Sequence, residues 1–397
     1  MNKRNVLAIM SVLLIVGVLI CIHTYLNNLE NTLIISIPSK DYFSDGIEHY
    51  GLNDFMSRYP QVKLSLKVQK DPSNPFQSAA DVYILNPTNY NVAATLDNKE
   101  LLDLSDLISA DSTDHLHRLD LFTNSDGELI ALPLFLGVYM LNNSTSVVNL
   151  ADNIADSNIG TWNILYKSPD KALLLTDPSL LIIARQLSEL AYTAATTDSP
   201  IVKQQLEQYL LDLKNLSESD TLDLLPSANS VPSYLTLEHG MLLDWFQATE
   251  STTIVHIPLP HYEAGIPLTP LAARIGVVSQ NTKHASLSVS FLESFVSLDA
   301  QMQLPTAGTV RTDIWSEIVR QYAEKTAWSA NSHLWWGEPI SHDAYKQYQL
   351  SVASGFLGHE SFQDTAKAIP LIKQFLTGEL PMCTVLDYLQ TAALSRN

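Results

Sequence analysis

The 397-residue chain is 46% hydrophobic and 16% charged, a balance that allows a sizeable buried core and argues against disorder. Its 42 acidic residues outnumber its 23 basic residues, and the formal net charge of −19 disfavours nucleic acid as a partner because phosphate is repelled. Only two cysteines occur, which excludes a disulfide framework. We expect Cys383 to be buried in a terminal helix.

The amino-terminal segment is predicted to cross a membrane once. Two basic residues, Lys3 and Arg4, precede residues 6–22 (VLAIMSVLLIVGVLICI), which carry no charge. A membrane helix needs roughly 17–25 residues, and basic flanking residues tend to stay in the cytoplasm. We therefore expect residues 1–30 to be a signal anchor and neck, with a cytoplasmic amino terminus and the rest of the chain outside the cell.

Two other interpretations of this segment stay open. The residues that end in Cys21 resemble a bacterial lipoprotein signal, although Ile20 is bulky where a small residue is expected. Cys21 is then the lipidated residue. A cleaved signal peptide is the third alternative, but no A-x-A-like cleavage site follows the apolar run.

Strand-like and helical runs alternate along the rest of the chain. Regular alternation of strands and helices predicts βαβ units and a mostly parallel sheet. After the anchor about 370 residues remain, which suggests two domains or one two-lobed unit. Strands are expected at residues 32–37, 62–68, 80–85, 128–142, 171–177, 254–259 and 271–279. Helices are expected at residues 41–59, 180–195, 201–216, 285–297, 314–325, 362–377 and 384–394.

Short motifs then follow one another in a recognisable order. They are residues 80–84 (ADVYI), 101–108 (LLDLSDLI), 126–133 (DGELIALP), 139–143 (YMLNN), 160–162 (GTW), 258–260 (PLP), 275–284 (IGVVSQNTKH) and 377–381 (TGELP). The order of these motifs and the residues in them resemble those of the extracellular solute-binding proteins of bacterial ABC importers, specifically the family 1 group of sugar binders. Residues 213–231 and 329–343 match no part of that pattern.

The resemblance implies an α/β, two-lobed, periplasmic-binding-protein-like fold of type II that closes on a ligand through hinge strands. Its motif order places hinge segments at residues 133–141 and 271–279. It also implies one lobe from residues 31–137 plus 272–315. The second lobe, which is mostly helical, takes residues 138–271 plus 316–397.

Candidate ligand-binding residues follow the first and third strands, because open α/β sheets bind ligands beyond the carboxyl ends of their strands. For these residues the alternative is ordinary loop and helix-capping chemistry, with Ser39 or Asp41 as an N-cap. Asp177, which precedes Pro178, is a further candidate with the same alternative. The residues near the first and third strands are Ser36, Ser39, Lys40, Asp41, Tyr42, Asn86 and Thr88.

Aromatic residues are the second group of candidates, because a flat apolar face with a polar edge suits a sugar ring. Trp335 and Trp336 are adjacent in a polar stretch (SANSHLWWGEP), which core packing explains poorly. Trp245, Phe135 and Tyr139 complete this group of expected ligand contacts.

Metal and enzyme chemistry find little support. His115 and His117 form the only close histidine pair, whereas a metal site needs three or four converging ligands. We expect solvent-facing histidines, no metal and no cofactor. None of the hydrolase, metalloprotease, phosphate-loop or dinucleotide motifs occurs, so no catalytic residue is assigned.

We therefore expect a membrane-anchored extracellular protein that captures a small solute and passes it to ABC permease subunits. A sugar or oligosaccharide is the expected solute. Two alternatives stay open. The same fold serves a sensory or scaffold protein that binds a partner protein, or the chain is an anchored cell-wall glycan hydrolase.

Overall fold

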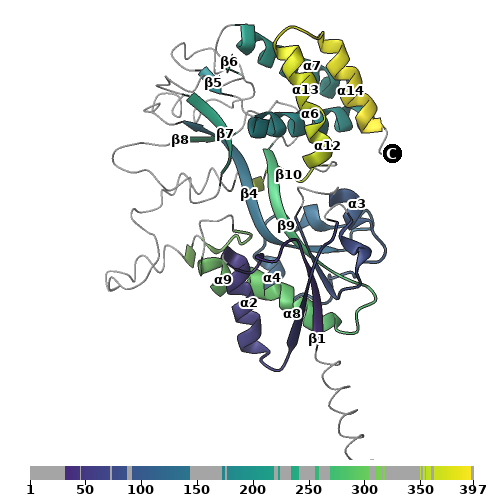
Figure 1. Cartoon of the computed structure of the whole chain (residues 1–397), viewed down its shortest axis with the longest axis vertical. Helices are drawn as coiled ribbons and strands as arrows, with labels where there is room; N and C mark the ends of the chain where they lie inside the picture. Colours follow the sequence, from purple (N-terminus) through teal and green to yellow (C-terminus); the bar gives the residue numbers. More distant parts are fainter. Residues whose placement is uncertain are drawn as a thin grey trace, which may run out of the picture.

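A computed structural model describes the greater part of the chain beyond the expected anchor (Figure 1). The described residues are 32–44, 46–71, 74–86, 92–143, 172–174, 177–218, 222–223, 234–240, 255–258, 269–303, 309–314, 316–317, 349, 352–353, 355–358 and 362–394. Within these ranges, no helix combines the length and the apolar character that a membrane crossing requires. The expected anchor and Cys21 lie outside the described residues, so both stay predictions.

The strands form one mixed sheet in the order β2-β1-β3-β9-β4-β7-β5-β6, with β10 beside β9 and β8 beside β4. β1 is parallel to β2 and β3, whereas β9 is antiparallel to both β3 and β4. Among the described strands five pairings are parallel and four are antiparallel, so the expectation of a mostly parallel sheet is confirmed only in part. The strands are β1 (Thr32–Ile37), β2 (Lys63–Val68), β3 (Val82–Leu85), β4 (Ala131–Asn143), β5 (Ala172–Leu174), β6 (Leu222–Asp223), β7 (Tyr234–Gly240), β8 (Val255–Pro258), β9 (Thr269–Val278) and β10 (Gly355–Phe356).

The helices cover this sheet and build a separate helical layer (Figure 1). The expected helix at residues 362–377 is two helices, because Pro370 lacks an N–H donor and stands at the start of the second one. The helices are α2 (Gly46–Arg58), α3 (Val92–Leu96), α4 (Ala110–Asp114), α6 (Asp177–Thr197), α7 (Pro200–Glu218), α8 (Ala285–Val296), α9 (Leu298–Gln303), α12 (Phe362–Ala366), α13 (Ile369–Leu376) and α14 (Met382–Leu394), with short 3-10 turns at Pro75–Gln77 and Leu119–Phe122.

The first hydrophobic core lies between the sheet and helices α2 and α8. β1 contributes three fully or almost fully buried side chains, Leu33, Ile35 and Ile37. The ring of Phe291 on α8 stands edge-on to two other rings, 5.1 Å from that of Phe55 and 5.0 Å from that of Phe295. Burial of each such side chain contributes about 1.5–3 kcal/mol, so this core holds β1, α2 and α8 as one unit.

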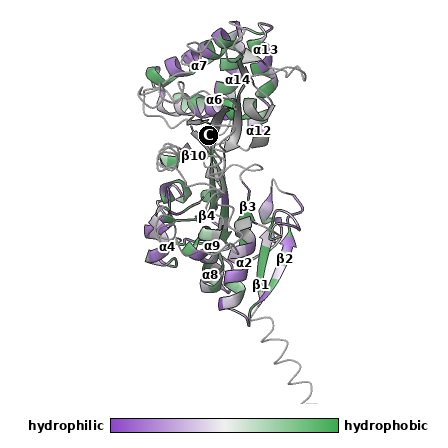
Figure 2. Cartoon of the chain, turned by 90° about the vertical axis from the view of Figure 1, so that its left-hand side faces the viewer, coloured by the Kyte–Doolittle hydropathy of each residue, from purple (hydrophilic) through white to green (hydrophobic). Residues whose placement is uncertain are grey.

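The second core is helical. Helices α6, α7, α13 and α14 bury mainly leucine and alanine side chains against one another, together with Tyr209. The Tyr209 hydroxyl is fully buried and donates a hydrogen bond to the side-chain oxygen of Gln186. Figure 2 shows these helices at one end of the molecule, α2, α4 and α8 at the other, and β4 running between the two ends.

Two long strands connect the two ends. β4 pairs with β9 from Ala131 opposite Val277 to Val138 opposite Leu271. Beyond Val138, β4 pairs instead with β7 and β8. The expected hinge segments lie largely within β4 and β9, while the lobe boundaries drawn from the sequence stay predictions.

Cys383 lies on α14, as expected, but its side chain is exposed rather than buried. The buried residues of this helix are Val385, Leu389 and Ala393, which recur every four residues. Cys383 precedes Val385 by two positions, about 200° around the helix axis, and therefore faces away from the core.

Candidate ligand-binding site

The candidate site lies at the edge of the sheet where β1 and β3 end. These two strands are parallel neighbours, with Ser36 opposite Tyr83. The carboxyl ends of parallel neighbours meet at one edge of a sheet, so the turn after β1 and the residue after β3 share that edge. That turn contains Ser39, Lys40, Asp41 and Tyr42, and the residue after β3 is Asn86.

β9 and β4 pass the same edge on their way to the second core. Ile275 of β9 pairs with Leu85, the last residue of β3, and also with Pro133 of β4. The β4–β9 register shifts between Pro133 and Phe135, and Phe135 then pairs with Arg274. A proline has no N–H for the ladder, and such irregularities re-aim the side chains that follow. Phe135 and Arg274 therefore stand one step beyond the end of β3.

Three side chains converge at this level. The guanidinium carbon of Arg274 lies 5.1 Å from the ring centroid of Phe135 and 5.9 Å from that of Tyr42. Phe135 is only 7% exposed, whereas Tyr42 and Arg274 are half-buried. Attraction between a cation and aromatic rings at these distances contributes about 0.5–1 kcal/mol or more when partly desolvated. The structure thus brings together two of the predicted residues and adds a third.

This cluster offers chemistry that suits a polyhydroxylated ligand. Aromatic rings present flat apolar surfaces, and a guanidinium presents up to five N–H donors in one plane and no acceptor. Hydroxyl groups accept such hydrogen bonds. Arg274 was not among the residues predicted from the sequence. It is the single charged residue in an otherwise apolar strand (LAARIGVV), and this contrast could have marked it as a candidate.

The other candidates near this edge differ in accessibility. Ser39, Lys40 and Asp41 are exposed, and Asn86 is half-buried. Ser36 is fully buried one residue before the end of β1, so its contact with a solute stays a prediction. Of the alternative for Ser39 and Asp41, the capping role was wrong, because α2 begins only at Gly46, whereas the loop role agrees with the structure. The backbone N–H and the hydroxyl of Ser44 both donate to the carbonyl oxygen of Asp41, so this segment is a turn.

Some candidates are placed only in part or not at all. Tyr139 lies in β4, opposite His239 of β7, and Asp177 is the first residue of α6. The side chains of these two residues are not described, so their contacts stay predictions. Thr88, Trp245, Trp335 and Trp336 lie outside the described residues, and their contacts stay predictions as well.

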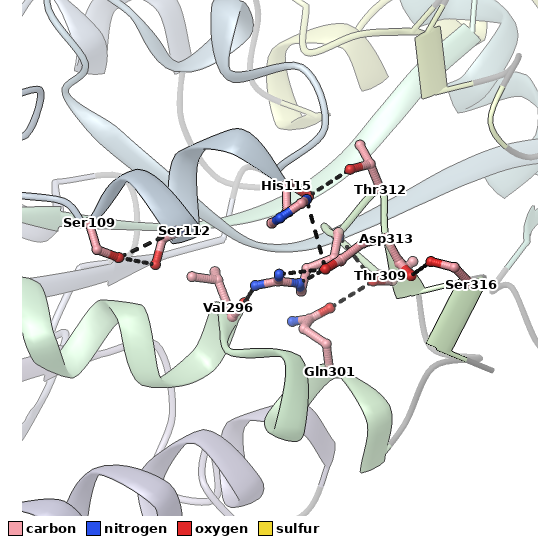
Figure 3. A network of polar contacts seen from close by, with 10 residues as sticks. Ser109, Ser112, His115, Val296, Gln301, Thr309, Thr312, Asp313 and Ser316 are labelled. Atoms are coloured by element: carbon pink, nitrogen blue, oxygen red, sulfur yellow. Dashed lines mark hydrogen bonds and ion pairs between the residues drawn. The ribbon is translucent and has the colours of Figure 1, made fainter. Parts of the chain in front are cut away.

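A network of polar contacts holds residues 309–313, which lie beside α4 (Figure 3). The guanidinium of Arg311, almost fully buried, forms two hydrogen bonds of 2.7 Å with the carboxylate of Asp313 and donates to the carbonyl oxygen of Val296. Burial alone would raise the pKa of Asp313, but the hydrogen bonds and charge of Arg311 and the charge of His115 hold that pKa below its usual value. Nδ1 of His115 lies 3.8 Å from the Asp313 carboxylate.

The histidine pair divides between surface and interior. The side chain of His115 is 41% exposed, as expected, but His117 is only 9% exposed. Burial lowers the pKa of His117 to about 4, although the hydrogen bond of its imidazole to the backbone of Arg311 and the charge of Asp313 act in the opposite direction. The expectation that both histidines face solvent was wrong for His117. Among the described residues, no group of three or more His, Cys, Asp and Glu side chains is placed to hold a metal ion.

Two hollows of about 630 Å³ and 420 Å³ lie away from the candidate site, and Leu101 lines both of them. Leu101 forms an isolated antiparallel β-bridge with Ser279, the residue that follows β9. This end of β9 lies farther from the second core than the other end. The larger hollow is lined mainly by acidic and amide side chains of residues 97–103 and 124–128. The candidate binding edge is therefore defined by convergent side chains and not by these hollows.

No protein-family profile matches the chain, and no curated protein sequence matches it. The structure nevertheless matches solved structures over almost its whole length. The cyclic alpha-maltosyl-1,6-maltose binding protein of Arthrobacter globiformis is 14% identical, with a TM-score of 0.62, and the match covers 92% of this chain and 98% of that one. A sugar transporter protein of Rhizobium etli in an open conformation is 12% identical, with a TM-score of 0.62 and coverage of 92% and 99%.

Glycerophosphocholine-bound UgpB of Mycobacterium tuberculosis is 11% identical, with a TM-score of 0.62 and coverage of 92% and 98%. Likeness of this extent shows that the chain has the two-domain α/β fold of solute-binding proteins. The resemblance seen in the sequence is confirmed at the level of the fold.

Proposed function

We propose that the chain captures a sugar or oligosaccharide between its two lobes and passes it to the permease of an ABC importer. The observation that carries the proposal is the cluster of Tyr42, Arg274 and Phe135 at the edge where β1 and β3 end. Two members of the cluster lie on β4 and β9, the strands that connect the two lobes. All three residues belong to the first expected lobe, so the proposal requires the second lobe to close over a solute that rests on this cluster.

Capture of this kind needs no chemical step. A solute that binds the closed arrangement more tightly than the open one shifts the population towards closure, and equal affinity for both would shift nothing. Structural neighbours of the chain bind cyclic maltosyl-maltose, maltose, D-mannitol and cycloalternan, which supports a carbohydrate as the solute.

We also propose that residues 1–30 anchor the protein in the cell membrane, with the two-lobed part outside the cell. The uncharged apolar run of residues 6–22 after Lys3 and Arg4 supports this proposal. The exposed thiol of Cys383 provides a test in intact cells. A membrane-impermeant maleimide should label the wild-type chain and leave the Cys383→Ser variant unlabelled. Labelling that requires cell lysis would refute the extracellular placement.

The binding proposal is tested by thermal shift of the full-length chain in mild detergent. The probes are maltose, cycloalternan, D-mannitol and D-tagatose, together with glycerophosphocholine. A probe at 100 times its dissociation constant stabilises the folded chain by about 2.7 kcal/mol. At least one carbohydrate should raise the melting temperature, and the shift should rise with its concentration.

The variant Arg274→Gln should reduce that shift, because it removes the charge and the planar donor group from the candidate site. Arg58→Gln is the matched control, since Arg58 is an exposed arginine on α2 that pairs with Asp54. Equal shifts in Arg274→Gln, Arg58→Gln and the wild type would remove the candidate site from the proposal. No shift with any carbohydrate would refute the proposed solute class.

A further inference from the structure

A third segment of the chain, residues 352–353 and 355–358, runs beside β9. Its strand β10 is parallel to the start of β9, with Gly355 opposite Thr269 and Phe356 opposite Pro270. In Figure 1, β10 lies between the helical end of the molecule and the end that contains β1 and α8. The side chains of Val352 and Leu357 are buried in the first core.

Arg118 holds the beginning of this segment to the first lobe. Its Nη1 donates to the carbonyl oxygens of Val352 at 3.2 Å, Ala353 at 2.7 Å and Gly355 at 3.0 Å. Its Nε and Nη2 donate to the carboxylate of Asp120, each at 2.9 Å in the shortest contact. A two-point contact of this kind fixes the plane of the guanidinium, so the remaining donors stay directed at the three carbonyl groups.

The backbone of Arg118 supports a specific role for this contact. Its φ of 51° and ψ of 44° lie in the left-handed region, which non-glycine residues adopt at an energetic cost. Such a conformation persists where surrounding contacts determine it. Here the contacts of the side chain with Asp120 and with the carbonyl groups of Val352, Ala353 and Gly355 do so.

Arg185 holds the end of the segment to the second lobe. It lies on α6, is 3% exposed, and donates from Nη2 to the carbonyl oxygen of Leu357. Gly358 has a φ of +80°, and a Cβ there would stand 2.5 Å from Nη2 of Arg185. The positive φ therefore favours glycine at this position, and a side chain there would displace the Arg185 guanidinium.

The contacts of Arg118 and Arg185 with this segment lie close together along the chain. Arg118 reaches the carbonyl oxygen of Gly355, Arg185 reaches that of Leu357, and only Phe356 separates the two residues. A Cβ at Gly355 would stand 2.5 Å from Cδ2 of Leu271, which shows how closely this segment packs on β9. Leu271 in turn pairs with Val138, the last residue of β4 that pairs with β9.

We propose that Arg118 and Arg185 are positioning residues that make residues 355–357 the fixed pivot of lobe movement. Each arginine ties the segment to a different lobe, so a change in the angle between the lobes is confined to the backbone around Phe356 and the adjacent parts of β4 and β9. Sliding of the segment along β9 would break the contacts of Arg118 with three carbonyl groups.

The test measures the distance between the lobes with no solute present, so its outcome is independent of the proposed function. The full-length chain in mild detergent carries Cys21→Ser and Asp106→Cys, and dyes on residues 106 and 383 report single-molecule energy transfer. Residue 106 is an exposed turn position of the first lobe, and Cys383 is exposed on α14 of the second. Arg58→Ala serves as the control that removes an exposed arginine–aspartate pair from α2.

Arg118→Ala should increase the population outside the main distance peak about tenfold, the factor for one lost charge-assisted hydrogen bond. Arg118→Lys should give a smaller increase, because a lysine cannot form the two-point contact with Asp120. Asp120→Asn changes an exposed residue and so provides a variant that keeps its fold, and it should broaden the distribution in the same direction. Distributions equal to wild type in Arg118→Ala and Asp120→Asn, or equal broadening in Arg58→Ala, would overturn the proposal.

Discussion

The buried histidine beside α4 predicts a loss of stability at mildly acidic pH. Burial lowers the pKa of His117 from 6.5 to about 4, so the folded chain keeps this imidazole neutral in the interval between those values. An unfolded histidine takes up a proton as the pH falls through 6.5. The unfolded state then binds more protons than the folded state, and the free energy of unfolding decreases as the pH falls.

The size of the effect follows from the two pKa values. With a pKa of 6.5 in the unfolded chain and about 4 in the folded chain, the contribution of His117 to the free energy of unfolding is nearly complete above pH 6.5. At pH 5 this contribution is smaller by about 2 kcal/mol. At pH 4 the reduction reaches about 3 kcal/mol, and it changes little at lower pH because the folded histidine is then protonated as well.

Urea unfolding of the chain at pH 7 and at pH 5 measures this difference. Other titrating groups also contribute, so the quantity to compare is the change with pH in the wild type and in His117→Asn. Between pH 7 and pH 5, the free energy of unfolding should fall by about 2 kcal/mol less in His117→Asn than in the wild type. Equal pH dependence in His117→Asn and the wild type would refute the burial argument.

Three further predictions follow from the packing. Gly51→Ala should destabilise the first core by about 1–3 kcal/mol in urea unfolding, because its Cβ would stand 2.4 Å from the ring of Phe295; no loss would contradict this packing. Tyr209→Phe should cost about 0.5–1.5 kcal/mol in the same assay, since it removes the buried hydrogen bond that the Tyr209 hydroxyl donates to Gln186, and an unchanged free energy of unfolding would contradict a stabilising role for this bond. Cys383 should react with a thiol reagent in the folded chain as fast as in urea, and protection without urea would contradict its exposure.

The long elements of the fold were predictable because their patterns are local. The apolar spacing of residues 180–195 and 201–216 predicted α6 and α7, which the structure extends by a few residues at each end. The strand expected at residues 271–279 is β9, Thr269–Val278. These segments satisfy their hydrogen bonds and bury their apolar faces over many residues, so their own sequence determines them.

The pairing of the strands was not predictable in the same way. β9 is antiparallel to β3 and β4, and β7 pairs with strands that are distant in the sequence. Direction and neighbours in a sheet depend on contacts between remote segments, and periodicity carries no information about them. The strand β7 alternates apolar and polar residues only from Leu235 to Glu238, which is too short a pattern to indicate a strand by itself.

Part of the candidate site followed from the rule that ligands bind beyond strand ends. That rule placed Tyr42 and Asn86 at one edge, and the order of the motifs added Phe135. Arg274 was not predicted, because its role depends on the register that sets it opposite Phe135 and near Tyr42. A pattern of single residues cannot specify a register between strands more than 100 positions apart.

The most direct measurement of the central claim is a crystal structure of the chain with the carbohydrate that gives the largest thermal shift. The account predicts a solute that lies against the rings of Tyr42 and Phe135, accepts a hydrogen bond from Arg274 and contacts residues of both lobes. A solute bound away from this edge, or one that contacts a single lobe, would contradict it.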